Sequence, residues 1–285
     1  MKECNNPIRK QFNSKISLTI AYFLLGVVGA IFLIPIIFMV LTALKDLPQI
    51  YSGRFLPHPL HLENFTTMLT KYVPFPLQMK NSFIIATLAM IGEVLSAAFV
   101  GYGFARFKFP FRDIWFVILI GTMMMPFFVR MIPLFIIFRK LGWVDTFLPL
   151  IVPSFLGTPL FIFLMRQVFM SYPFELSEAA KIDGASELTI WSKIFLPLAK
   201  PGMAAVAILA FQQHWNEFVS PLIFLHSKEK MTAVLGLYSL LTPQEVIEWN
   251  VVMAMTIILV LPIAILFTVF QRAFVEGVTV SGMKG

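Results

Sequence analysis

The chain has 285 residues, 58% of them hydrophobic and 13% charged, and its mean hydropathy is +0.83. Soluble domains are about 45–50% apolar and about 25% charged, so this composition excludes an ordinary soluble protein. The formal net charge is +7, but the basic residues gather at the edges of apolar segments, which favours membrane topology over nucleic-acid binding. The single cysteine, Cys4, excludes a disulfide within the chain.

Six apolar segments are long enough to cross a bilayer, which takes about 20 helical residues. The sequence therefore predicts an all-α integral membrane protein with six transmembrane helices. The first segment is too long for the apolar core of a signal peptide, about 7–15 residues, so we expect it to be retained. The expected spans are residues 17–44, 81–104, 114–138, 147–165, 202–225 and 251–270.

Basic residues in the short loops predict the orientation of these spans. With the N-terminus inside, the cytoplasmic segments hold 13 Lys and Arg residues, the other side holds 8, and Arg130 lies within a span. We therefore expect both termini, and the loop between the fourth and fifth spans, in the cytoplasm.

Two spans have features that predict how they pack. The fourth carries Pro149, Pro153 and Pro159, so it is expected to be bent and packed inside the bundle. The second carries small residues four apart, Gly92 with Ser96 and Ala97 with Gly101, a spacing that lets another backbone approach closely. The second span is therefore expected to lie in a helix interface.

The loop of residues 174–200 is predicted to form two short helices joined at a hinge. Pro173 suits the first turn of a helix, and Glu175 and Glu178 favour its positive N-terminal end. Gly184 permits a sharp turn, and Asp183 can cap one of the flanking helices.

The second of these short helices is expected to be amphipathic. Leu188, Trp191 and Phe195 fall at helical spacing and form an apolar stripe, which needs a partner. Pro197 and Pro201 are expected to end this element and to start the next span.

The spacing of the loop is similar to the EAA loop of binding-protein-dependent ABC importer permeases. Glu178-Ala179-Ala180, three residues, Gly184, nine residues and then Ile194-x-Leu196-Pro197 match the family's pattern in full. Three further segments look like the carbohydrate-importer branch of this family, while the first 80 or so residues match loosely. These segments are Glu178 to Gly184, Trp215 to Phe218 with Pro221-Leu222, and Gln271-Arg272 with Phe274, Gly277 and the closing Lys284-Gly285.

The resemblance implies partners and a division of the chain. The loop would form a coupling helix that docks in a cleft of a cytoplasmic ATPase, and a second homologous permease subunit, two ATPase subunits or domains, an extracytoplasmic solute-binding protein and membrane lipid would complete the importer. The chain would consist of a cytoplasmic tail, 1–16, a permease domain, 17–271, and a second cytoplasmic tail, 272–285. The docking residues would be Glu178, Ala179, Ala180, Asp183, Gly184, Ala185 and Leu188.

No phosphate-binding loop of the type G-x-x-x-x-G-K-[ST] occurs in the sequence. We therefore expect no cofactor in this chain, with ATP and Mg bound by the partner ATPase, and no covalent chemistry. His58, His61 and Glu63 lie in a Pro-rich loop, where a metal site is not expected.

Polar residues within the spans are candidates for the solute pathway. Glu93 and Arg130 are ionisable residues at membrane depth, where charge is costly and usually faces a cavity or a partner. For Glu93 we favour structural pairing; Arg130 lies between two prolines, where a broken helix could present it to an anionic solute group. Trp215, Asn216 and Glu217 could bind a polyhydroxylated solute by stacking and hydrogen bonds, or could have a structural role.

The expected solute is a sugar, an oligosaccharide or a polyol, with glycerol phosphate or a phosphodiester as the specific minority option. The alternative is an ion-coupled secondary transporter that uses Glu93 and Arg130 as a relay. That alternative leaves the EAA-like loop unexplained.

Overall fold

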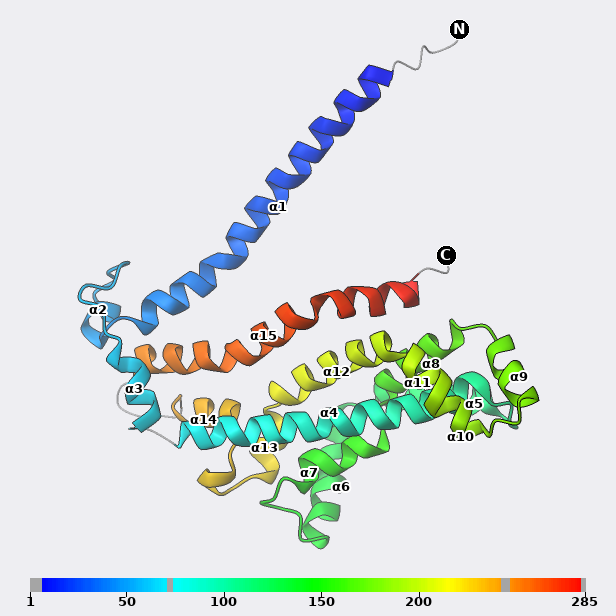
Figure 1. The fold of residues 1–285 in the computed structure, drawn as a ribbon. Helices are drawn as coiled ribbons and strands as arrows, with labels where there is room; N and C mark the ends of the chain where they lie inside the picture. Colours follow the sequence, from blue (N-terminus) through cyan, green and yellow to red (C-terminus); the bar gives the residue numbers. More distant parts are fainter. Residues whose placement is uncertain (1–6, 71–73, 242–246, 283–285) are drawn as a thin grey trace. The chain divides into compact units, whose positions relative to one another are not determined.

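A computed structural model describes residues 7–70, 74–241 and 247–282, and every regular element in these ranges is helical (Figure 1). The predicted all-α class is confirmed. Cys4 and the closing pair Lys284-Gly285 lie outside the described residues. Contacts divide the chain into a first unit, residues 1–71 with 245–257, and a second unit, residues 72–244 with 258–285.

The first unit contains α1 (Pro7–Ala43), α2 (Leu47–Tyr51), α3 (Glu63–Thr70) and the first residues of α15 (Trp249–Gly282). The first predicted span lies within α1 except for its last residue, Leu44. Buried amides join the ends of these helices: Asn64 Nδ2 donates to Ala43 O and Lys45 O, each at 2.8 Å, and Asn250 Nδ2 donates to Asn64 Oδ1 at 2.8 Å.

The second unit is built around α4 (Phe75–Arg106), which packs against α8 (Pro159–Met170) and α12 (Lys200–Trp215) (Figure 1). The interface predicted from small residues is confirmed. A Cβ atom at Gly101 would lie 2.9 Å from the backbone N of Arg166 in α8, and one at Gly92 would lie 2.7 Å from the Phe155 ring. Hydrogen in place of a side chain therefore lets α8 and its preceding turn approach α4.

The third and fourth spans are both interrupted. The third consists of α5 (Arg112–Gly121), the 3₁₀ turn Thr122–Met124 and α6 (Phe127–Lys140), bent by 96°. The break falls at Pro126, which holds the preceding Met125 in an extended conformation, so the span 114–138 is not one straight helix, and the broken helix considered around Arg130 is present. The fourth consists of α7 (Leu148–Ile151), the 3₁₀ turn Val152–Leu156 and α8, with Gly157 at φ +86° before α8; together they form one candidate span, Leu148–Met170, and its bend stays a prediction.

The fifth span ends earlier than predicted. α12 stops at Trp215, and a separate helix, α13 (Val219–Phe224), follows after a break, so the span 202–225 is wrong. The Glu217 carboxylate accepts hydrogen bonds from the N–H and the hydroxyl of Ser220, each at 3.0 Å, and so caps the first turn of α13.

The remaining elements complete the second unit. Between α8 and α12 lie α9 (Glu175–Ile182), α10 (Glu187–Thr189), the π-helix Ile190–Phe195 and α11 (Leu196–Leu198); α14 (Ala233–Ser239) precedes α15. The described residues contain four helices long and apolar enough to cross a membrane, or up to six if each bent pair forms one span. The second bent pair joins residues 187–198 to α12 at 76°, rather than α12 to α13.

Candidate functional site

The hinge of the 174–200 loop is fixed by backbone conformation. Gly184 has φ +77°, a left-handed conformation that suits glycine, and its N–H donates to Lys181 O at 3.0 Å. The Ala185 N–H donates to Ala180 O at 2.9 Å, which closes the end of α9. The side-chain cap of α10 is Ser186, whose Oγ accepts from Thr189 N at 3.3 Å, whereas Asp183 only occupies the position after α9.

The residues predicted to dock a partner lie on two faces of the 174–200 loop, one packed against the second unit and one exposed. Ala180 is buried and Ala185 packs against the core of the second unit, so both anchor the loop. The other five are exposed: Glu178, Ala179, Asp183, Gly184 and Leu188. The predicted docking residues do not include Ile182, although it lies within the matched motif and its residue surface is 86% exposed.

The apolar stripe of the second short helix is turned partly inward. Phe195 is fully buried, and the Trp191 ring packs edge-on against Phe99 of α4 at 5.4 Å between centroids. Trp191 Nε1 also donates to Ala98 O at 3.4 Å. The helix α4 is therefore the partner that the stripe required, and only Leu188, 63% exposed, is left for another molecule.

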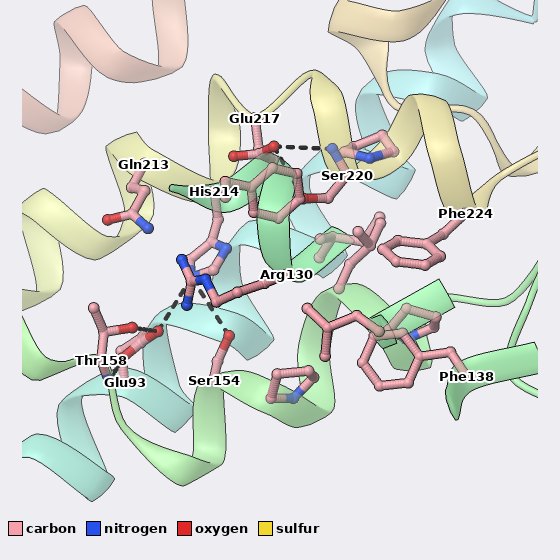
Figure 2. A pocket seen from close by; sticks show the side chains of 17 residues that line it. Glu93, Arg130, Phe138, Ser154, Thr158, Gln213, His214, Glu217, Ser220 and Phe224 are labelled. Carbon is pink, nitrogen blue, oxygen red and sulfur yellow. Dashed lines mark hydrogen bonds and ion pairs between the residues drawn. The ribbon is translucent and has the colours of Figure 1, made fainter. Parts of the chain in front are cut away.

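A polar cavity of about 260 Å³ lies within the second unit (Figure 2). Glu93 of α4 is buried beside it, and its carboxylate accepts hydrogen bonds from Thr158 N at 2.9 Å and from Thr158 Oγ1 at 2.6 Å. His214 Nε2 of α12 lies 3.8 Å from Glu93 Oε1 and 3.5 Å from Ser154 Oγ. These contacts join α4, α8 with its preceding turn, and α12 at one point.

Arg130 and Glu217 complete the charged lining of the cavity (Figure 2). Among the described residues, Glu93 pairs with Thr158 and His214 and not with Arg130, and these contacts agree with the structural role favoured for Glu93. The Arg130 side chain is exposed, and within the described part of the chain it has no hydrogen bond or ion pair. Its guanidinium is therefore available to a ligand or to another protein chain.

Trp215 and Asn216 do not line the cavity. The Trp215 side chain is buried, stacks on Phe211 at 5.5 Å, and donates from Nε1 to Leu259 O of α15 at 3.1 Å. The stacking role considered for Trp215 is therefore wrong, because its ring packs between helices. The structure brings together Glu93, Arg130 and Glu217, and it adds Ser154, Thr158 and Gln213, which sequence reasoning missed.

A carboxylate clamp joins two loops beyond α6 and α13. Asp145 Oδ1 accepts from His226 N and Ser227 N, each at 2.9 Å, and its Oδ2 accepts from Ser227 Oγ at 2.5 Å and Lys230 Nζ at 3.2 Å. The hydrogen bonds from Ser227, His226 and Lys230 lower the pKa of the Asp145 carboxyl well below its ordinary range, against an opposing effect of burial. The clamp therefore holds the carboxylate ionised.

The sequence of residues 93–280 matches a protein-family model described as "Binding-protein-dependent transport system inner membrane component". The chain belongs to this family. It is a permease subunit of an ATP-binding-cassette importer and a multi-pass protein of the cell membrane, and the resemblance found in the EAA-like loop is confirmed. The matched residues include the loop and all of the cavity lining except Ile85.

Similar proteins agree with this assignment. The permease is 37% identical to the arabinooligosaccharides transport system permease protein AraQ of Halalkalibacterium halodurans, over 81% of this chain and 82% of that protein. It is 32% identical to the sn-glycerol-3-phosphate transport system permease protein UgpE of Salmonella typhimurium, over 87% of this chain and 91% of that protein. The crystal structure of a bacterial ABC transporter for the acidic polysaccharide alginate contains a chain with the same fold, with a TM-score of 0.80 and 24% identity, over 92% of this chain and 98% of that one.

Proposed function

We propose that this permease moves a sugar, an oligosaccharide or a polyol, with glycerol-phosphate-like solutes included, across the cytoplasmic membrane. Two ATPase subunits that bind ATP and Mg drive the transport, and a second homologous permease and an extracytoplasmic binding protein complete the importer. Both termini lie in the cytoplasm, and this chain carries out no covalent chemistry. The names of the relatives AraQ and UgpE support the solute class.

The two-faced 174–200 loop is the observation that carries this proposal. Ile182 and Leu188 flank the hinge and are exposed, while Ala180 and Phe195 are buried in the second unit. Exposed apolar side chains on a short, firmly packed element suit a protein interface, and a stiff element transmits a rigid-body motion. The loop can therefore dock an ATPase and pass its movement to the bundle.

The polar cavity is the proposed solute pathway within this subunit. Its lining offers carboxylate acceptors from Glu93 and Glu217, hydroxyl groups from Ser154 and Thr158, and the donors of Arg130, a mixture that suits a polyhydroxylated solute. The unpaired guanidinium also suits a phosphate or carboxylate group on such a solute. An ion relay through Glu93 and Arg130 has less support, since these two residues do not pair.

The docking role is tested by placing a charge on the exposed tip of the loop. In the complex purified with its sister subunit, ATPase and binding protein, Ile182→Glu is expected to lower the amount of ATPase retained by about 30-fold, the effect of losing one interface hot spot of about 2 kcal/mol. The control is Leu141→Glu, at a residue 54% exposed in the loop after α6, and it should retain the ATPase.

Transport in proteoliposomes provides the second part of the test. Uptake by the intact complex is expected to need ATP, and Ile182→Glu should abolish it. Full ATPase retention by Ile182→Glu would contradict the docking role, and uptake driven by an ion gradient without any ATPase would contradict the proposed function as a whole.

A further inference from the structure

Arg106, the last residue of α4, is buried where the 174–200 loop begins. Its Nη2 donates to Phe169 O and Tyr172 O, each at 2.7 Å, and its Nη1 donates to Pro173 O at 3.2 Å. These carbonyl groups belong to the last turn of α8 and to the link that leads into α9. Carbonyls at the end of a helix lack partners within the helix and attract a cation, so one guanidinium satisfies them together.

The same guanidinium also reaches both ends of the loop. Its Cζ lies 4.8 Å from the Phe174 ring centroid, before α9, and 4.4 Å from the Phe195 ring centroid, at the end of the π-helix. A cation over an aromatic face is attracted to the ring, and more strongly when it is shielded from water. Arg106 therefore joins α4 to the start and to the end of the loop.

Tyr102, one turn earlier on α4, strengthens this connection. Its ring lies 5.3 Å from the Phe195 ring, and its hydroxyl donates to Glu187 Oε2 of α10 at 3.4 Å. Glu187 Oε1 in turn lies 2.5 Å from Lys181 Nζ of α9, across the hinge. The last turn of α4 thus contacts α10 directly and α9 through this ion pair.

The opposite direction along α4 leads to the cavity. Glu93 lies 13 residues before Arg106 in one continuous helix, which corresponds to about 20 Å at about 1.5 Å per residue. We propose that Arg106 is a positioning residue that makes α4 move with the 174–200 loop, so that movement of the ATPase reaches the cavity through α4. This inference rests on the proposed function, because it requires the loop to be driven by an ATPase.

The test compares three variants in the complete importer reconstituted in proteoliposomes. Arg106→Gln is expected to keep the ATPase bound and hydrolysing while the solute transported per ATP falls by about tenfold or more, the factor expected for loss of one charged hydrogen bond. Arg106→Lys should restore part of this ratio, because lysine keeps the charge but lacks the planar fork of donors. The matched control is Arg166→Gln, since the Arg166 guanidinium lies 4.1 Å from the Phe116 ring and, within the described residues, makes no hydrogen bond or ion pair to the loop, and it should couple normally.

A measurement of the distance between α4 and the loop distinguishes a positioning role of Arg106 from a merely structural one. In a background with Cys4 replaced by serine, spin labels at the exposed positions Leu95 on α4 and Lys193 on the loop should give one narrow distance with and without ATP. In Arg106→Gln this distance should broaden when ATP is bound, whereas in Arg166→Gln it should stay narrow.

Two results would overturn the inference. One is an Arg106→Gln importer with the wild-type ratio of transport to hydrolysis or with a distance that stays narrow. The other is loss of the ATPase from an inserted Arg106→Gln permease, which would assign Arg106 to folding of the docking surface. Failure of the proposed function would look different, because the wild-type importer itself would then show no ATP-dependent uptake.

Discussion

Replacing the hinge glycine with a β-branched residue tests the mechanics of the loop most directly. Gly184 has φ +77°, and a Cβ atom there would meet nothing within 4 Å. Gly184→Val therefore adds no clash and acts only through the backbone, where an L-residue in the left-handed region costs about 1–2 kcal/mol. That strain lowers the population of the native hinge by about 5–30-fold relative to alternatives in which α9 and α10 meet at another angle.

We expect Gly184→Val to insert normally, because the hinge lies outside the helices that are long enough to span the membrane. ATPase retained on the purified complex, and solute transported per ATP in proteoliposomes, should both fall. The matched control is Gly142→Val, which carries the same strain at φ +69°, also meets nothing within 4 Å, and lies in the loop after α6. Wild-type coupling in Gly184→Val, or equal uncoupling in Gly142→Val, would refute the reasoning.

Three further substitutions probe the packing of the second unit through thermal unfolding in detergent. Gly101→Val should lower the free energy of unfolding by about 1–3 kcal/mol, because its side chain would clash with the backbone of α8. Gly103→Val, which has open space at its Cβ, should unfold at a higher temperature than Gly101→Val. Equal melting temperatures of the two variants would contradict the close approach of α8 to α4. Asp145→Asn should cost about 1.5–3 kcal/mol at pH 7. Because the pKa of Asp145 is lower in the folded state, its ionised carboxylate stabilises the fold fully above the unfolded pKa of about 4, and this stabilisation is lost as pH falls toward the folded pKa. The difference in free energy of unfolding between wild type and Asp145→Asn should therefore shrink at pH 3. A difference that stays constant with pH would exclude a role of the charge. Glu93→Ala should cost about 1–3 kcal/mol for each Thr158 group left unpaired, more than Glu93→Gln, and a wild-type melting temperature for Glu93→Ala would rule out this hydrogen-bonded role.

The features predicted correctly from sequence are those fixed by local chemistry. The hinge at Gly184 and the break at Pro126 follow from which backbone conformations glycine, proline and the residue before proline can adopt. The close approach of another helix to α4 follows from Gly101, because small residues four apart let a second backbone approach closely, although the sequence did not name α8 as that partner.

The features that were missed depend on residues far apart in the chain. Trp215 turns away from the cavity because α15 offers it Leu259 O, and Trp191 turns inward because α4 offers it Phe99 and Ala98. Helical periodicity places such an apolar side chain on one face of its helix, but it does not indicate which neighbouring helix that face will contact. The early end of α12 was missed for another reason, since hydropathy does not register that Glu217 caps the next helix.

Two buried charged residues of α4, Glu93 and Arg106, explain why a single helix can contact both the loop and the cavity. Glu93 is held through Thr158 at the start of α8, and Arg106 is held by carbonyls at the end of α8, so α4 and α8 are fastened together at two separated points. Between these points Gly101 brings the two backbones into contact. We expect a helix pair fastened in this way to resist bending, which is why we infer that a displacement at the loop end reaches the cavity end. The buried charges of Glu93, inside α4, and Arg106, at its end, therefore belong to the same mechanical element, even though they lie about 20 Å apart along the helix.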